Sequence, residues 1–182
     1  MSNVIDIRRV RGSDRYSIDF YLKSHLRDFV CALSGGDTFH INMFNVVGCI
    51  ALSTLTKKPA HAHRVNDTFF VGRERVVGTI SVDHARREGL HSCSLPVFEA
   101  LVEHLFKHMM LVHVDLRRDQ GMTQMDAIRE FLAIYDVDLD AITIETLKKT
   151  MQRRRKRAQA NTSAAGKFRA TVSPAPEVRK AS

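Results

Sequence analysis

The sequence predicts a mainly α fold: about five helices, a small β-hairpin between the second and third, and a disordered basic C-terminal tail. Two observations support this class. Apolar residues recur at steps of three and four along most of the chain, which is the period of a helix buried on one side. Alternating β-branched runs are short and confined to two places. We expect one mostly helical globular domain over residues 1–158 and a disordered tail over 159–182.

The first elements are a short strand and a helix. Residues 4–10 are β-branched and alternate imperfectly, which favours a short strand. From Ser17 the apolar residues take helical steps, with Ser17 as the N-cap and Gly35-Gly36 as the stop. The residues of this helix expected to face inward are Ile18, Leu22, Leu26, Phe29, Val30 and Leu33.

A second helix is expected from Asp37 or Thr38 to about Thr56. It is apolar almost all round, a pattern that predicts a buried helix. Residues 59–94 are the least helical part of the chain. There, residues 68–71 and 74–77 flank Gly72-Arg73, the spacing of a two-residue hairpin turn, and the N-terminal strand is a candidate to join this hairpin.

The remaining helices follow recognisable caps. Ser94 can cap a long helix that begins at Leu95-Pro96 and ends before Asp119. Its expected inward stripe is Val97, Leu101, Leu105, His108, Val112 and Leu116, widened by Phe98, Val102, Phe106 and Met109. Thr123 caps a helix to about Tyr135, and Thr143 caps a last helix that continues into a run of basic residues.

Positive charge is concentrated at the C-terminus. Residues 148–182 hold eleven Lys and Arg against one acid, a net charge of +10, whereas residues 1–147 hold 17 basic and 19 acidic residues. Segregated cations of this kind are typical of segments that bind polyanions. We therefore expect a nucleic-acid-binding protein, regulatory or accessory in role, with DNA as the expected polymer. The residues expected to hold phosphates are Lys148, Lys149, Arg153, Arg154, Arg155, Lys156 and Arg157.

The basic run is also compatible with a solvated helix end or with a membrane contact. Cations are favoured near a helix C-terminus even without a ligand, and an acidic membrane surface also attracts them. The helices from Met122 to Tyr135 and from Thr143 to Arg157 form a helix–turn–helix-like pair, or a plain helical hairpin, with Asp136, Asp138 and Asp140 in an acidic connector. In composition, residues 122–157 resemble the helical ends of small DNA-associated proteins of phages and other mobile elements, a similarity that assigns no residue.

Nine histidines suggest an alternative function, a metal-dependent enzyme. His61 and His63 fall on one side of an extended backbone, and His104 and His108 lie one helical turn apart. One imidazole nitrogen from each of these four histidines could ligate zinc, although no established zinc motif is present. Otherwise no cofactor is expected, and no catalytic motif is found: the Gly35-Gly36 pair lacks the rest of a phosphate loop. A third hypothesis is a helical adaptor with a polyanion-binding tail.

The compartment and partners follow from composition. Three widely spaced cysteines, Cys31, Cys49 and Cys93, predict reduced, buried and unreactive thiols. The chain has no signal peptide and no apolar run long enough to span a bilayer, so we expect a cytoplasmic protein, or a nuclear one in a eukaryotic host. Nucleic acid is the expected partner, together with a second copy of the chain or another protein, and no membrane is expected.

Overall fold

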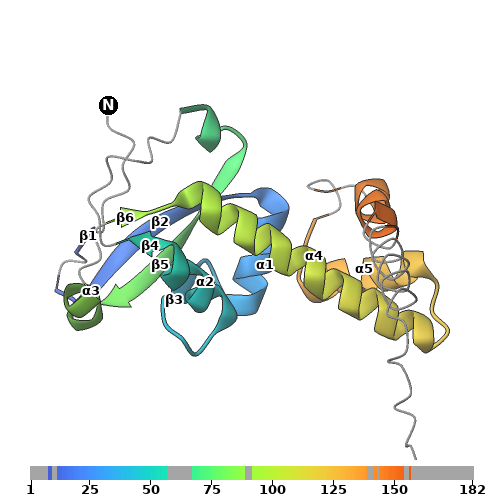
Figure 1. The fold of residues 1–182 in the computed structure, drawn as a ribbon, viewed down its shortest axis with the longest axis horizontal. Helices are drawn as coiled ribbons and strands as arrows, with labels where there is room; N and C mark the ends of the chain where they lie inside the picture. The colour runs from blue at the N-terminus through green and yellow to red at the C-terminus, as the bar shows by residue number, and fades with distance from the viewer. Residues whose placement is uncertain are drawn as a thin grey trace, which may run out of the picture. The chain divides into compact units, whose positions relative to one another are not determined.

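The computed structural model describes residues 8–9, 12–56, 67–88, 92–138, 142, 144–153 and 156. The chain divides into two compact units, Met1–Ile142 and Thr143–Ser182. The first is an α+β unit, and the described part of the second is a single helix (Figure 1). The helix-rich character predicted from the sequence is confirmed, but the β structure is more extensive than one hairpin.

A four-stranded sheet forms the centre of the first unit. Its strand order is β1 (Arg8–Arg9), β2 (Arg15–Lys23), β5 (Arg73–Ser81) and β3 (Thr38–His40). The β2 and β5 strands pair antiparallel over their whole length, and β3 pairs parallel with β5. A second, two-stranded sheet pairs β4 (Leu55–Thr56) with β6 (Ser92–Cys93).

Helices α1 (Ser24–Ser34) and α4 (Leu95–Asp119) pack against the sheet, and α2 (Val46–Thr54) packs against α4 and β3. The α5 helix (Gln124–Ile134) packs on α4, away from the strands (Figure 1). The α3 helix (Val82–Glu88) follows β5, and a 3-10 turn, η1, lies at Asp67–Phe70. Phe20 of β2 packs on Phe98 of α4, with ring centroids 4.1 Å apart, and on Phe39 of β3 at 5.5 Å. Phe106 of α4 continues this core toward α1 and α5 through ring contacts with Phe29 and Phe131.

The first predicted helix is wrong over residues 17–23, which belong to β2. Alternate residues Ile18, Phe20 and Leu22 are fully buried, and this is the period of a strand with one face in the core. The helix begins only at Ser24. It ends where the sequence indicated, because Gly35 adopts the left-handed conformation with φ 74°.

The second predicted helix is also too long. Residues 38–40 form β3, where Phe39 enters the core, and α2 begins at Val46 after its N-cap, Asn45. The Asn45 side chain accepts a hydrogen bond from the amide of Gly48. The expectation of burial all round is wrong as well, since Val46 is 45% exposed.

The predicted hairpin is not formed. Residues 67–70 make the 3-10 turn, and β5 pairs with β2 and β3 instead of with its neighbour in sequence. Gly72 is a turn residue, with φ 67°, but it joins the 3-10 turn to a strand. The N-terminal strand pairs with β2 rather than with this segment, through Arg8 and Arg9.

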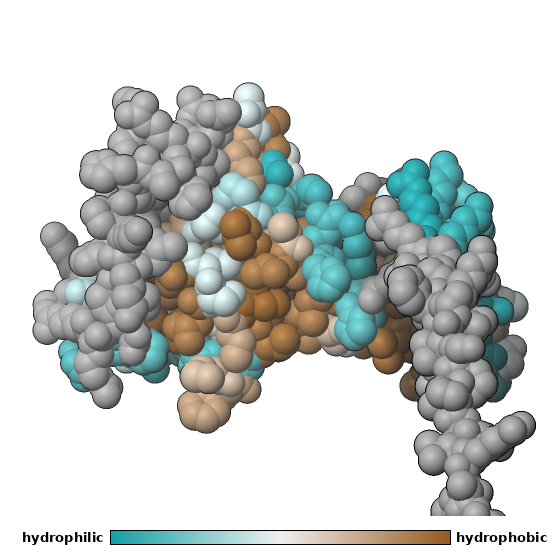
Figure 2. Space-filling view, viewed as in Figure 1, coloured by the Kyte–Doolittle hydropathy of each residue, from teal (hydrophilic) through white to brown (hydrophobic). Residues whose placement is uncertain are grey.

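The long helix α4 has the predicted bounds but a rotated buried face. Phe98, Val102, Phe106, Met110 and Val114 lie inward. Four residues of the predicted stripe are exposed by 38–56%: Val97, Leu101, Val112 and Leu116. Figure 2 shows the hydrophobic residues gathered on the surface over α2 and α4. Thr123 caps α5 as predicted, accepting a hydrogen bond from the Asp126 amide at 3.2 Å.

Candidate nucleic-acid interface

The basic helix predicted at the C-terminus is present in the second unit. Residues 144–153 and 156 are helical, and the Thr150 hydroxyl donates to the Thr146 carbonyl at 2.9 Å, as an intact turn allows. Of the seven predicted phosphate ligands, the structure describes four. Arg154, Arg155 and Arg157 lie outside the described residues.

The described cations fall into two groups. Lys148 is engaged locally, with Nζ 3.1 Å from Glu145 Oε1. Lys149, Arg153 and Lys156 are exposed. Their spacing of four and three residues places them on one side of a helix, along about 10 Å of its axis. The result is a row of three cations, here called the basic stripe.

The boundary between the units is also a charge boundary. Residues 1–142 carry 17 basic and 18 acidic side chains, and residues 143–182 carry 11 basic and two acidic ones. The first unit is therefore close to neutral, whereas the second has a net charge of +9. A polyanion is attracted to the second unit by charge that the first unit does not share.

The helix–turn–helix-like pair is divided between the units. Its first helix, α5, belongs to Met1–Ile142, and its second begins after that boundary. Thr143, the predicted N-cap, lies outside the described residues. A DNA-reading arrangement of these two helices therefore stays a prediction.

The structure describes two of the four proposed zinc ligands. His104 and His108 are exposed on α4, one turn apart. His61 and His63 lie outside the described residues. Within the part of the chain that the structure describes, no three His, Cys, Asp or Glu side chains form a group able to hold a metal ion. A zinc site built from all four histidines remains a prediction.

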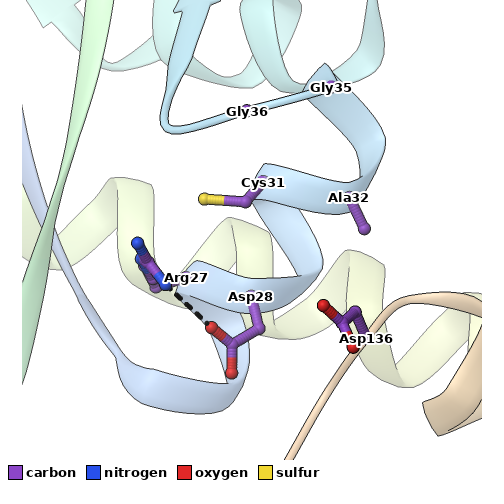
Figure 3. Close-up of a pocket in the computed structure, with 7 residues that line it drawn as sticks. All are labelled: Arg27, Asp28, Cys31, Ala32, Gly35, Gly36 and Asp136. Carbon is purple, nitrogen blue, oxygen red and sulfur yellow. Dashed lines mark hydrogen bonds and ion pairs between the residues drawn. The ribbon is translucent and has the colours of Figure 1, made fainter.

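The predicted burial of all three cysteines is correct only for Cys93, since Cys31 and Cys49 are partly exposed. Burial raises the pKa of the Cys93 thiol to about 11, and burial likewise raises the pKa of Cys31, so both are protonated near neutral pH. Cys31 lines a pocket of about 330 Å³ between α1 and the turn after α5, where Asp136 also lines it (Figure 3). In the same pocket Arg27 donates to Asp28 at 3.2 Å. A protonated thiol next to an internally paired arginine offers no catalytic dyad.

A second pocket brings together polar side chains that no sequence pattern connects. It measures about 490 Å³ and lies at one end of the four-stranded sheet. Cross-strand pairing of Arg15 with Ser81, and of His40 with Thr79, puts these four side chains on one face. His84 of α3 also lines the pocket. We call this the sheet-end pocket. The sequence did not indicate it because its residues come from five elements and a loop, and the pairing of the strands among them was not predicted.

A hydrogen-bonded chain reaches the cation of this pocket. The Thr79 hydroxyl donates to the Phe39 carbonyl at 3.3 Å, so its oxygen accepts from His40 Nδ1 at 2.9 Å. Arg15 Nη1 lies 3.2 Å from Nδ1 and 3.4 Å from Nε2 of His40. Arg15 Nη1 thus lies at similar distances from both ring nitrogens, so the guanidinium rests against the His40 imidazole. The guanidinium has five N–H donors, and this contact uses one of them.

Among the described helices, none combines the length and the apolar character needed to cross a bilayer. Comparison of the chain with protein-family models, with curated proteins and with solved structures gives no match. Its function has to be inferred from its own residues.

Proposed function

We propose that this protein binds nucleic acid in a regulatory or accessory role, with DNA as the expected polymer and the C-terminal helix holding its phosphates. The observation that carries the proposal is the basic stripe, Lys149, Arg153 and Lys156, which is exposed on a unit with a net charge of +9, whereas the first unit is nearly neutral. Arg154, Arg155 and Arg157 add charge to the same segment.

The physical basis is counterion release. Each phosphate neutralised by a Lys or Arg frees condensed cations from the polymer, and the gain in entropy favours binding at low salt. Contacts of this type position a protein on a nucleic acid but do not read its sequence. The proposal therefore concerns affinity and salt dependence, and it assigns no target site.

A helix C-terminus also favours cations through the macrodipole, an effect worth about 0.3–1 kcal/mol per charge at an exposed site. That effect accounts for one or two basic residues in the last turn. It does not account for seven basic residues in the ten positions from Lys148 to Arg157 without an acid among them. The density of one sign of charge supports a polyanionic partner.

The test is an equilibrium binding assay at low salt with duplex DNA, single-stranded DNA, RNA and anionic lipid vesicles. It compares the full chain with the triple variant Lys149→Gln, Arg153→Gln, Lys156→Gln. The matched control removes three exposed cations of the first unit, Arg75→Gln, Arg118→Gln and Arg129→Gln. Both triples lower the net charge by three.

We expect the stripe variant to lose at least tenfold in affinity for nucleic acid, because three phosphate contacts disappear, and the control to stay within about twofold. Equal losses of affinity in the two triple variants would show that binding depends only on the net charge of the protein. Binding to vesicles but to none of the three polymers would assign the helix to a membrane surface and contradict the proposal.

A further inference from the structure

We propose that the sheet-end pocket of the first unit binds a mononucleotide, with the phosphate at Arg15 and the base against Phe44. This goes beyond the proposed role of the C-terminal helix, which it does not require. The pocket volume, about 490 Å³, is within the range of sites for small molecules. Three features of the pocket support this ligand: its polar lining, its apolar rim and the loop that carries the rim.

The polar lining suits an anion. Arg15, His40, His84, Thr79 and Ser81 present a guanidinium, two imidazoles and two hydroxyls. Of the lining residues that the structure describes, none is Asp or Glu. Arg15 Nη1 contacts the His40 ring, and His40 is joined through Thr79 to the Phe39 carbonyl, so the guanidinium has a protein contact at the pocket before a ligand arrives. Guanidinium donors are the usual partners of phosphate oxygens.

The apolar rim suits a planar ring. Phe44 is 96% exposed and Met43 is 76% exposed, yet both line the pocket together with the buried Ile41. An aromatic side chain this exposed gains nothing from the protein core. Beside an anion-binding group, it provides a surface on which a base can stack.

The loop that carries Phe44 is fixed by hydrogen bonds. The Phe44 amide donates to Asn42 Oδ1 at 2.9 Å, and the Asn45 side-chain amide donates to the His40 carbonyl at 3.0 Å. Asn45 also caps α2 by accepting from the Gly48 amide. At the other end, the Ile41 amide donates to the Thr79 carbonyl at 2.8 Å. Phe44 is thus displayed by a structured loop tied at both ends to the strands of the pocket wall, which lowers the ordering cost of binding.

The first experiment is calorimetric titration of the full chain with adenosine 5′-monophosphate, adenosine and inorganic phosphate. We expect saturable one-site binding of the nucleotide, at least about tenfold tighter than either of its parts, since both halves of the pocket contribute. Absence of saturable nucleotide binding at millimolar concentration would overturn the proposal. Inorganic phosphate binding as tightly as the nucleotide would also overturn it.

Variants locate the site. Arg15→Gln and Phe44→Ala should each weaken nucleotide binding by about tenfold or more, and Phe44→Tyr should restore it. Matched controls are Arg129→Gln, an exposed cation elsewhere, and Val71→Ala, an apolar residue that is 75% exposed and outside the pocket. Both controls should bind normally. Because Phe44 is almost fully exposed, Phe44→Ala leaves the core intact, and unchanged affinity in that variant would contradict the proposal.

Two sources could supply such a ligand, a free nucleotide or the phosphorylated end of a strand. A tetranucleotide with or without a 5′-phosphate distinguishes them by competition with the mononucleotide. The assay uses the Lys149→Gln, Arg153→Gln, Lys156→Gln background, so that the basic stripe cannot capture the strand. Tighter binding of the phosphorylated strand than of the mononucleotide supports the strand end, and the reverse order supports a free nucleotide. Loss of mononucleotide binding in this background would contradict the assignment to the first unit.

Discussion

Gly48 and His40 approach so closely that a Cβ on Gly48 would lie 2.5 Å from the His40 carbonyl oxygen. The same Cβ would lie 2.7 Å from the Asn42 carbonyl oxygen. Both neighbours are backbone atoms, which cannot move aside as a flexible side chain does. The first turn of α2 and the loop that displays Phe44 therefore depend on the missing side chain at this position.

The first prediction is that Gly48→Ala destabilises the protein. Crowding of this kind costs about 1–3 kcal/mol in the free energy of unfolding. It also displaces the loop, so affinity for adenosine 5′-monophosphate should fall. Urea unfolding and calorimetry measure the two effects. Alanine is the better helix former by about 1 kcal/mol, so a variant stabilised by that amount would show that the close approach is not real.

The second prediction concerns the buried ion pair between β5 and α4. Arg73 Nη2 lies 2.9 Å from Glu99 Oε2, Nε adds bonds of 3.1 and 3.0 Å to the two carboxylate oxygens, and the Glu99 side chain is 7% exposed. Glu99→Ala removes the carboxylate from the guanidinium, which keeps only its contacts with the Phe69 carbonyl and ring among those described, and should lower the free energy of unfolding by about 3 kcal/mol.

The control for this pair is Asp126→Asn, because Asp126 pairs with Arg129 on the surface of α5 at 3.3 Å. An exposed pair contributes little, and the change should cost less than about 1 kcal/mol. Equal costs for Glu99→Ala and Asp126→Asn would mean that the Arg73–Glu99 pair does not join the sheet to α4.

The third prediction tests which face of α4 is buried. Met110 is fully buried and Val112, two residues later, is 55% exposed. Met110→Ala should cost about 2–5 kcal/mol, and Val112→Ala at most about 0.5 kcal/mol. Chemical denaturation of the two variants measures both costs. A larger cost for Val112→Ala than for Met110→Ala would mean that the face predicted from the sequence is the buried one, and would contradict the structure.

The fourth prediction concerns pH. Burial, and next the nearby positive charge of Lys23, lower the pKa of His25 below its ordinary value, partly offset by Glu103 and Glu99. The unfolded chain therefore binds the proton more readily, and stability is lost as the pH falls from about 6.5 through the folded-state pKa. Replacing His25 by Leu should flatten the dependence of unfolding free energy on pH between about 7 and 5. An equal dependence of the unfolding free energy on pH in the original protein and in the His25→Leu variant would rule out a contribution from His25.

The elements that sequence patterns predicted well are those whose ends have a local chemical cause. Thr123 caps α5, Gly35 ends α1, and α4 starts at Leu95 and stops at Asp119. The β2 strand was missed because Ile18 and Leu22 fit helical and strand periods equally well, and only its partner β5 decides between them. Short apolar segments carry this ambiguity whenever the deciding contact is remote in sequence.

The candidate sites divide in the same way. The basic stripe is local in sequence, so charge counting located it, including its exposed members Lys149 and Arg153. The sheet-end pocket depends on β2, β3 and β5 being neighbours, which no pattern in the chain indicates. Arg15 and His40 are 25 positions apart and meet only through that topology.

The salt dependence of duplex DNA binding tests the central proposal most directly. Plotted as log affinity against log salt concentration, each phosphate contact contributes a slope of about −0.9. Replacing Lys149, Arg153 and Lys156 by Gln should make the slope less negative by about 2.7, whereas the three-residue control in the first unit should leave it unchanged. Equal slopes for the full chain and the stripe variant would show that these side chains hold no phosphates.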